Sequence, residues 1–512
     1  MKSEEKSVSA RVAIIGSGFG GLGAAIRLKQ EGFEDFVILE RASDVGGTWR
    51  DNTYPGCACD VESHLYSFSF APNPEWTHSF SPQPEIWAYL KRCARDFGLL
   101  PHIRFQHEVR EAVWEEDAQQ WRIETSQGSF TASVLVMAAG ALSEPRLPQL
   151  PGLENFQGKV FHSARWEHDY DLTERRVAVV GTGASAIQFV PEIQPHVSKL
   201  HIFQRTPPWI VPRRDRRLSE RERRLFRRFP AAQRAVRASI YLFRELFLLG
   251  FRHLWLAGQI EKLARRHLER QVTDPTLRAK LLPDYAIGCK RILISNNYFP
   301  SLMRSNVEVI TEGIAEVRAS SIVDRSGVER EVDAIIFGTG FRVTDPPLAA
   351  HIRGREGRTL AEVWAGSPQA HAGTTVAGFP NLFILLGPNT GLGHNSVVYM
   401  IEAQIEHLMA ALKYMWRRGA CAIEPRPEAQ SAFVAEVQKR MEGTVWIAGG
   451  CASWYLDSTG RNSTIWPDFT WRFRRRVARL NRDEYVLSFP EKAEQQPAEL
   501  FQPLATREAK HV

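Results

Sequence analysis

The 512-residue sequence predicts an α/β protein with two domains, each built on a parallel sheet. Three observations carry this prediction. An apolar strand runs into a glycine-rich turn and a helical pattern at residues 11–28, the strand and turn recur at 176–186, and two further strands end in glycine at 134–140 and 334–340. These are the parts of dinucleotide-binding (Rossmann-like) domains, in which we expect the glycine-ending strands to close the sheets. A chain of this length also favours two or three domains over one compact core.

The first unit contains the residues that a dinucleotide requires. Gly16, Gly18 and Gly21 follow the pattern G-x-G-x-x-G directly after the strand. Gly16 permits the tight turn, Gly18 lets the backbone approach a pyrophosphate, and Gly21 allows close packing of the helix on the strand. The helix then presents free N–H groups and the positive end of its dipole to phosphates. The next strand, 36–39, ends in Glu40, which is placed to accept a hydrogen bond from a ribose hydroxyl.

The second unit, at 176–186, has the allowed variant G-x-G-x-x-A and differs in charge at one place. Arg205 lies as far along the chain from Gly181 as Glu40 does from Gly16. An acid at that place repels a 2′-phosphate, whereas an arginine binds it through charge-assisted hydrogen bonds. We therefore expect a cofactor with a free ribose 2′-OH at the first site and NADPH, in preference to NADH, at the second. The alternative for Arg205 is a solvated cation at a strand end.

Composition excludes several classes of protein. The first ten residues are polar and lead directly into a strand, so no secretory signal is predicted. The six cysteines are scattered, and none of them forms a C-x-x-C. This argues against a disulfide scaffold, a zinc site and a thioredoxin-type redox pair, and it favours a reducing, cytoplasmic setting.

The positive net charge of +7 is local. Residues 213–237 hold eleven arginines against three acids, within a stretch, 213–289, that we expect to form a helical excursion. The first interpretation is a solvated helical face that covers the second domain. The second is contact of residues 213–258 with an anionic membrane surface, because apolar side chains accompany the arginines. Nucleic-acid binding ranks last, since no recognised binding fold accompanies the charge. A membrane-spanning helix is not predicted either, because the apolar stretch 241–258 is too short and too charged to span a bilayer.

Two further motifs flank these turns and narrow the function. Phe156, Gly158, His162 and Trp166 have the spacing F-x-G-x3-H-x3-W and lie between the two dinucleotide turns. Residues 47–60 fill every position of the pattern G-x-W-x4-[FY]-P-G-x3-D. In both motifs the chain resembles the type I Baeyer–Villiger monooxygenases, a family of class B flavoprotein monooxygenases. The resemblance runs nearly the whole chain, from Val12 to about Trp471.

The resemblance implies a discontinuous FAD domain wrapped around an inserted NADPH domain. The implied boundaries are 1–145 and 372–512 for FAD, 146–212 and 290–371 for NADPH, and 213–289 for a helical subdomain. We expect the tail after about residue 490 to be disordered, because it is polar and lacks periodicity.

The implied activity is an NADPH- and O2-dependent insertion of oxygen next to a ketone carbonyl, which gives an ester or lactone through a C4a-peroxyflavin. The partners are then a small-molecule ketone and O2. Arg291 matches the family's catalytic arginine, a permanent cation that keeps the peroxide anionic, and Asp60 matches the aspartate that positions it. The alternatives are a helix cap for Asp60, before residues 61–64, and a surface cation for Arg291. Trp166 favours this branch over relatives that oxygenate nitrogen or sulfur, although Glu167 stands where the family usually has Pro or Asp.

The cofactor-binding residues expected from the motifs form one set. They are Gly16, Gly18, Gly21, Glu40, Thr48, Trp49, Asp60, Gly181, Gly183, Ser185, Arg205, Thr206 and Trp454. Trp454 resembles a family tryptophan at the nicotinamide end of NADP+, and its alternative is core packing. We expect His162 and Trp166 to be structural and to couple NADPH binding to the flavin, without an acid–base role, and we expect no metal.

Two other functions compete with the leading one. The first is an oxygenase of sulfur or nitrogen, in which the peroxide is protonated and electrophilic. The second is a non-catalytic flavin-binding module for redox sensing or membrane docking, which would bind FAD without ketone-dependent turnover. Residues 387–394 look more like the subgroup that accepts aryl or open-chain ketones than the cyclohexanone type.

Overall fold

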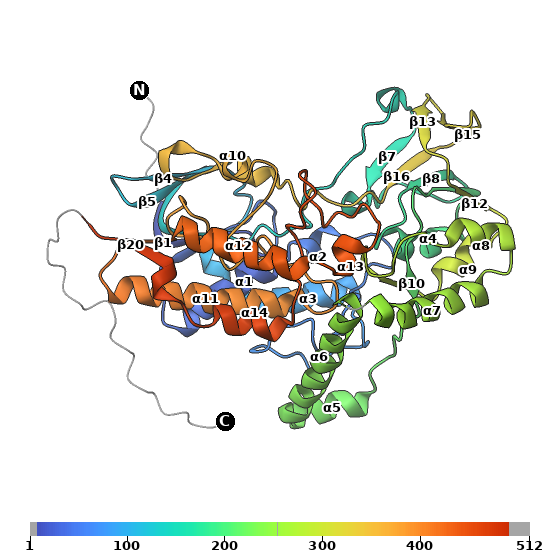
Figure 1. Cartoon of the computed structure of the whole chain (residues 1–512). Coiled ribbons are helices and arrows are strands. Elements are labelled where there is room, and N and C mark those ends of the chain that lie inside the picture. Colours follow the sequence, from blue (N-terminus) through green and yellow to red (C-terminus); the bar gives the residue numbers. More distant parts are fainter. Residues whose placement is uncertain (1–7, 253, 491–512) are drawn as a thin grey trace.

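The computed structural model describes residues 8–252 and 254–490. Two lobes lie side by side, and a pair of helices projects below them (Figure 1). The sheet of the first lobe is parallel except where β5 pairs antiparallel with β4 and β6, and the sheet of the second lobe is parallel throughout. This confirms the predicted α/β architecture with two Rossmann-like units. The tail predicted to be disordered lies outside the described residues.

The first lobe contains an eight-stranded sheet in the order β17-β4-β5-β6-β1-β2-β3, with β18 paired to β6. Strand β1 lies at its centre, parallel to β2 and to β6, and its inner residues are apolar because both faces of the sheet are covered. The first expected return strand is confirmed, since β6 contains residues 134–137 and lies parallel to β1, and β18 adds a further parallel strand on its other side. The strands are β1 (Val8–Ile15), β2 (Phe36–Leu39), β3 (Ile103–Arg104), β4 (Val109–Glu115), β5 (Gln120–Thr125), β6 (Gly128–Met137), β17 (Ile352–Arg353) and β18 (Leu382–Ile384).

Helices α1 and α11 pack against one another beside this sheet. Five apolar side chains of helix α1 are fully buried, as the pattern after the first glycine turn predicts. The helices of this lobe are α1 (Phe19–Gln30), α2 (Thr48–Asp51), α3 (Gln83–Asp96), α10 (Leu360–Trp364), α11 (Val397–Arg417), α12 (Pro427–Met441), α13 (Val445–Ala448) and α14 (Thr470–Val477), and a hairpin pairs β19 (Ala422–Pro425) with β20 (Tyr485–Ser488).

The second lobe contains a five-stranded sheet in the order β12-β9-β8-β16-β7, parallel throughout. Strand β16 is the second predicted return strand, and it lies between β8 and β7. The elements are β7 (Lys159–His162), β8 (Arg176–Val180), α4 (Ala186–Ile193), β9 (Lys199–Phe203), α9 (Tyr298–Leu302), β12 (Val307–Ile310) and β16 (Ala334–Phe337), with an antiparallel sheet of β13 (Ile314–Val317), β14 (Ser321–Asp324) and β15 (Glu329–Glu331).

The predicted excursion is helical. It contains α5 (Glu220–Arg228), α6 (Pro230–Arg252), α7 (Leu254–Gln271) and α8 (Pro275–Leu281), and a short sheet of β10 (Ile210–Val211) and β11 (Leu293–Ile294) closes it against the second lobe. Ser219 and Glu222 form a capping box at the start of α5, which satisfies two backbone N–H groups there. Helix α6 crosses from the projecting end towards α13 in the first lobe (Figure 1).

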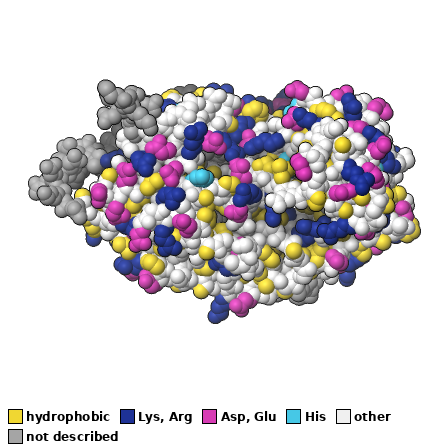
Figure 2. Space-filling view, turned by 90° about the horizontal axis from the view of Figure 1, so that it is seen from above, with side chains coloured by type: hydrophobic (Ala, Val, Ile, Leu, Met, Phe, Trp, Pro, Cys, Tyr) yellow, Lys and Arg dark blue, Asp and Glu magenta, His cyan; other side chains and the backbone are white. Residues whose placement is uncertain are grey.

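Charge is mixed on the face of the molecule that is seen from above. The face shown in Figure 2 carries acidic and basic side chains mixed with one another instead of one continuous basic surface. Within residues 8–252 and 254–490, none of the helices has both the length and the apolar character needed to cross a bilayer.

Candidate functional site

The first glycine turn has the geometry of a phosphate cradle. Gly16 has φ +97°, and a Cβ there would lie 2.8 Å from the Ala138 carbonyl oxygen. A Cβ on Gly21 would lie 1.8 Å from the Gly16 oxygen, so only glycine lets the helix approach the strand. Helix α1 starts after Gly18 with no side-chain cap, which leaves its first N–H groups available to an anion. These residues fit a dinucleotide pyrophosphate.

Glu40 lies at the end of β2 beside this turn and is buried. One carboxylate oxygen accepts from the Ser17 backbone N–H at 2.9 Å and from the Ser17 hydroxyl at 2.6 Å, and the other accepts from Ala42 N–H and Arg50, both at 2.9 Å. Burial alone would raise the pKa of Glu40, but Arg50 and these hydrogen bonds outweigh it and hold the pKa below its usual value. Glu40 is therefore an ionised acceptor at the place where the sequence predicts a ribose contact.

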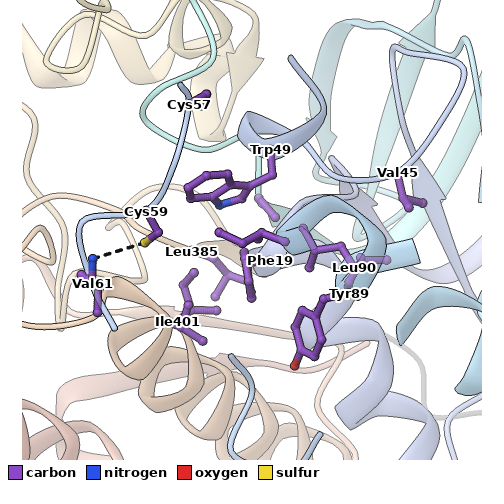
Figure 3. Packing of buried hydrophobic residues seen from close by; sticks show 14 of the residues in the cluster. Phe19, Val45, Trp49, Cys57, Cys59, Val61, Tyr89, Leu90, Leu385 and Ile401 are labelled. Carbon is purple, nitrogen blue, oxygen red and sulfur yellow. Dashed lines mark hydrogen bonds between the residues drawn. The ribbon is translucent and has the colours of Figure 1, made fainter. Parts of the chain in front are cut away.

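Thr48 and Trp49 open the short helix α2, next to the same turn. The Trp49 indole is buried and packs edge-to-face on Tyr66 with ring centroids 5.5 Å apart, and its N–H donates to the Tyr66 hydroxyl at 3.2 Å. Figure 3 shows Trp49 and Phe19 within one apolar cluster that also contains Cys59. The cluster places Trp49 beside the start of α1, and Cys57 and Cys59 pack within it as free thiols.

The second glycine turn repeats the cradle. Gly181 has φ +104°, and its Cβ would lie 2.6 Å from the Gly338 oxygen at the end of β16. A Cβ on Gly183 would have only one neighbour, at 3.9 Å, so this side of the turn is open. Helix α4 follows Ser185 without a side-chain cap, which again leaves N–H groups for an anion.

Arg205 is exposed at the end of β9, followed by Thr206. Burial, together with the nearby charge of Arg205, lowers the pKa of Lys290. The structure therefore brings a second cation to Arg205, and sequence reasoning missed it because the two residues lie far apart in the chain. Two cations that are close enough to influence each other suit a dianionic phosphate.

Asp60 and Arg291 form a bidentate ion pair. Arg291 Nε and Nη2 donate to the two carboxylate oxygens at 2.7 and 2.8 Å, and Nη1 donates to the Leu392 carbonyl at 3.2 Å. The side chains of Asp60 and Arg291 are 28% and 26% exposed, so solvent reaches the pair although most of its surface is buried. Burial opposes the charge on both groups, but their mutual attraction lowers the pKa of Asp60 and raises that of Arg291. The helix-cap alternative for Asp60 fails, because residues 61–64 form turns and no helix.

The residues of the F-x-G-x3-H-x3-W motif have distinct structural roles. A Cβ on Gly158 would lie 2.6 Å from the Phe156 ring and 2.4 Å from the Asp333 oxygen, so the ring covers this glycine. His162 ends β7 and is buried, and its Nδ1 accepts from Ala164 N–H at 3.1 Å. Burial lowers the pKa of His162 to about 4, so the ring is neutral at pH 7.

The two motifs meet at α4. Trp166 packs on Phe189 of that helix with ring centroids 5.3 Å apart, and Tyr54 packs on the same Phe189 at 6.0 Å. The Tyr54 hydroxyl donates to Gln188 at 3.0 Å. The two motifs are far apart in the sequence, but both contribute to the contact between the lobes.

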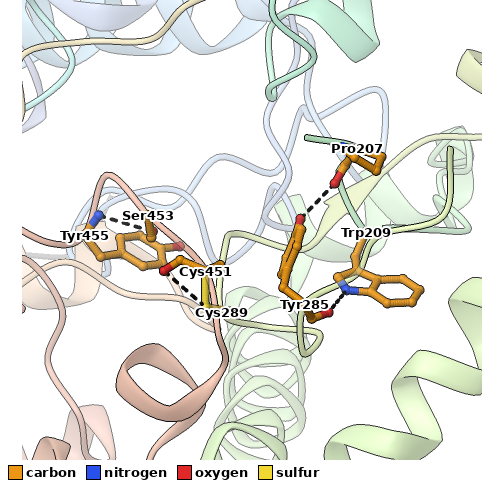
Figure 4. Close-up of a disulfide and its surroundings, with 7 residues drawn as sticks. All are labelled: Pro207, Trp209, Tyr285, Cys289, Cys451, Ser453 and Tyr455. Atoms are coloured by element: carbon orange, nitrogen blue, oxygen red, sulfur yellow. Dashed lines mark hydrogen bonds between the residues drawn. A yellow bond between two sulfur atoms is a disulfide. The ribbon is translucent and has the colours of Figure 1, made fainter. Parts of the chain in front are cut away.

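A disulfide joins Cys289, two residues before Arg291, to Cys451 (Figure 4). The scattered positions of the cysteines argue against a disulfide scaffold, and this single long-range disulfide was not predicted from them. The bond fixes the segment that carries Arg291 to the loop that carries Trp454 and Tyr455. The core-packing alternative for Trp454 fails, since its side chain is 44% exposed and rests on the Tyr455 ring at 4.4 Å.

Comparison with known proteins gives consistent matches. A family model described as flavin-binding monooxygenase-like matches residues 9–239. A protein of Streptomyces coelicolor named Baeyer–Villiger monooxygenase is 54% identical over 486 residues, which cover 94% of this chain and 94% of that protein. The solved structure of cyclohexanone monooxygenase from Rhodococcus sp. Phi1 bound to NADP+ has a TM-score of 0.85 at 29% identity, over 94% of this chain and all of the other. The OTEMO complex with FAD and NADP has a TM-score of 0.84 at 26% identity, with the same coverage.

Proposed function

This chain belongs to the Baeyer–Villiger monooxygenase family, whose members use FAD and NADPH to insert oxygen next to a carbonyl, and from that premise we propose that Asp60 and Arg291 form its catalytic pair. The bidentate geometry is the observation that carries the proposal. When bound, the reduced flavin supplies the activation of O2. Arg291 supplies a permanent positive charge where negative charge develops on the reacting oxygen, and Asp60 fixes the direction of the guanidinium.

The charge of one residue in each lobe, Glu40 in the first and Arg205 in the second, decides which cofactor is assigned to that lobe. We assign FAD to residues 1–145 and 372–512, with the first glycine turn and Glu40, Thr48 and Trp49 around it. NADPH is assigned to residues 146–212 and 290–371. The residues that hold it are Gly181, Gly183, Ser185, Arg205, Thr206 and Trp454. Ionised Glu40 and cationic Arg205 support this order, because each matches the charge of the ribose that it would face.

The substrate is proposed to be a ketone. One panel of an aryl, an open-chain and a cyclic ketone (acetophenone, 2-octanone and cyclohexanone) tests this, with ester or lactone measured against NADPH consumed. Arg291→Ala is expected to consume NADPH and release hydrogen peroxide without forming ester, because the reacting oxygen loses its stabilising cation. Arg304→Ala, which removes an exposed arginine, serves as the control and should leave the yield unchanged. Full ester yield from Arg291→Ala would contradict the assignment.

Sulfide oxidation distinguishes the competing activity. An electrophilic, protonated oxidant does not need the cation, so Arg291→Ala is expected to lose ketone oxidation while it keeps some oxidation of a simple sulfide such as thioanisole. Wild-type protein that oxidises thioanisole but none of the three ketones would favour the heteroatom oxygenase.

We also propose that exposed apolar side chains of α5 and α6 contact an anionic membrane surface. Leu242, Phe243 and Leu246 are 63%, 53% and 62% exposed on α6, and Leu225 and Phe229 are exposed on and after α5. The arginine-rich stretch 213–237 covers α5 and the first part of α6, just before these residues of α6. Exposed apolar groups beside an excess of basic groups fit a membrane with anionic headgroups, which needs both contributions for stable binding.

Sedimentation with phosphatidylglycerol vesicles at physiological salt tests this contact, with phosphatidylcholine vesicles as the neutral comparison. Wild-type protein is expected in the phosphatidylglycerol pellet. The double variant Leu242→Ser/Phe243→Ser should stay in the supernatant, whereas Leu147→Ser, equally exposed but in another part of the chain, should pellet like wild type. Wild-type protein that never pellets would contradict the proposal.

A further inference from the structure

The guanidinium of Arg291 is held from two sides. Its Nε and Nη2 donate to the carboxylate of Asp60, and its Nη1 donates to the carbonyl of Leu392. These two supports come from segments far apart in sequence, since Asp60 ends the 47–60 motif and Leu392 lies just before α11. The position of the cation therefore depends on what holds each support.

Arg244 of α6 contacts the first support. Its Nη2 donates to the Asp60 carbonyl oxygen at 3.1 Å, while Nε and Nη2 bind the Glu62 carboxylate at 2.8 and 2.7 Å. Its side chain is only 18% exposed. Asp60 is thus bound through its carboxylate by Arg291 and through its backbone by Arg244, which fixes it at both ends.

Glu245, the next residue of α6, contacts the segment of the second support. Its carboxylate is almost fully buried and accepts from Asn395 Nδ2 at 2.6 Å, and from the Thr470 hydroxyl and N–H at 2.6 and 3.0 Å. His394 Nε2 lies 3.6 Å from the same carboxylate. Glu245 therefore anchors residues 394–395, just after Leu392, and also the start of α14.

We propose that Arg244 and Glu245 are positioning residues that set the direction of the Arg291 guanidinium, each by holding one of its supports. Neighbouring residues on a helix point about 100° apart, so one turn of α6 can reach both segments. The inference rests on the proposed function, in which Asp60 and Arg291 act on the reacting oxygen. It assigns helix α6 of the excursion a role in catalysis that no motif in the sequence indicates.

The expected effect follows from geometry. A misplacement of about 1 Å at a reacting group costs on the order of a hundredfold in rate. Without Arg244, the Asp60 backbone and Glu62 lose their shared cation, and the ion pair with Arg291 can shift as a unit. Oxygen activation does not depend on that direction, so the reaction should continue to consume NADPH and should release hydrogen peroxide in place of ester.

The experiment compares Arg244→Gln and Glu245→Gln with Arg234→Gln, a control on the exposed face of the same helix. Each purified holoenzyme is measured for FAD content, melting temperature, NADPH consumption and the ratio of ester to hydrogen peroxide with the three ketones. We expect both test variants to keep NADPH consumption within about twofold and to lose at least about tenfold in that ratio. Arg244→Lys keeps the positive charge but lacks the planar guanidinium that binds two acceptors at once, so it should give an intermediate ratio of ester to hydrogen peroxide.

The pH profile separates positioning from simple loss of structure. The charged and titratable groups around Asp60 are Arg291, Arg244, Glu62, Cys59, Tyr54, Tyr66 and Tyr455. Both arginines lower the pKa of Asp60. Removing Arg244 should therefore raise that pKa and move the acid limb of ester formation to higher pH, and Arg244→Lys should move it back.

Each outcome has a defined meaning. Arg244→Gln and Glu245→Gln could give the wild-type ratio of ester to hydrogen peroxide while Arg291→Ala forms no ester. That result would overturn the positioning roles and leave the proposed function standing. A low FAD content with a normal ratio per bound flavin would also overturn them, because the role would then be structural only. If Arg244→Gln yields no holoenzyme, Arg244→Lys decides, and a wild-type ratio and acid limb from it overturn the inference. Full ester yield from Arg291→Ala would instead refute the proposed function.

Discussion

Trp166 and Tyr54 pack on the same ring, that of Phe189 in α4, at centroid distances of 5.3 and 6.0 Å. One belongs to the motif before the second glycine turn and the other to the motif after the first. A further contact reinforces the joint, since Thr53 Oγ1 and His168 Nε2 lie 2.7 Å apart. The two motifs are therefore parts of one interface, and the relative position of the two nucleotide turns depends on it.

Replacing Trp166 tests the strength of this joint. Trp166→Ala removes its contacts with Phe161 and Phe189, and we expect the free energy of unfolding to fall by about 2–3 kcal/mol for this half-buried side chain. Trp166→Phe keeps an aromatic ring there and should lose less. Urea unfolding of the holoenzyme measures both. An unchanged midpoint in Trp166→Ala would show that the aromatic contacts do not stabilise the interface.

Replacing Arg205 tests the choice of nicotinamide cofactor. Arg205→Ala should weaken NADPH by about 1.5–3 kcal/mol if one charged hydrogen-bonded contact to the 2′-phosphate is lost. The KM for NADH, which has no such phosphate, should stay nearly constant. Steady-state kinetics with both cofactors measure the ratio, and Arg304→Ala is the control. An unchanged preference for NADPH would remove Arg205 from the binding site.

Local patterns predicted the strands and turns of both lobes because their causes are local. Ile14 and its neighbours are buried on a central strand, and Gly16 adopts a positive φ. A short apolar run followed by a glycine is enough to predict both. The pairing of Asp60 with Arg291 was expected only from the family resemblance. No local pattern indicates that two segments so far apart in the chain should meet.

The contacts that sequence reasoning missed are all long-range. Arg244 and Glu245 looked like charges that interrupt an apolar helix, and only the packing of α6 on the first lobe reveals their partners. Lys290 and the Cys289–Cys451 pair belong to the same class. Such pairings depend on how whole elements pack, which periodicity does not encode.

The disulfide gives a direct chemical prediction. Denatured protein treated with iodoacetamide should take up four labels before reduction and six after it, because Cys57, Cys59, Cys93 and Cys421 are free. Reduction with dithiothreitol should also lower the free energy of unfolding by about 2–4 kcal/mol, since the bond closes a long loop. Cys451→Ser should show no further loss with dithiothreitol. Six labels without reduction would show that the bond does not form in the isolated protein.

Buried His162 contributes to the pH dependence of stability, as do His64 and His407, whose pKa burial also lowers to about 4. The pKa of His162 is lowered by burial to about 4 in the folded protein, against an ordinary value of 6.5. Above pH 6.5 the ring is neutral in both states and has no effect on stability. As the pH falls below 6.5, the unfolded chain takes up a proton that the folded protein does not, so stability is lost at about 1.4 kcal/mol per pH unit until about pH 4.

Replacing His162 should flatten this dependence. His162→Asn keeps an acceptor for Ala164 N–H but does not titrate, so the free energy of unfolding should fall by about 2 kcal/mol less between pH 6.5 and 5 than in wild type. His196→Asn, at an exposed histidine, is the matched control and should retain the wild-type slope. Urea unfolding at pH 7, 6.5, 6 and 5 measures the slopes. Equal slopes for wild type and His162→Asn would mean that the folded protein takes up the proton as readily as the unfolded chain.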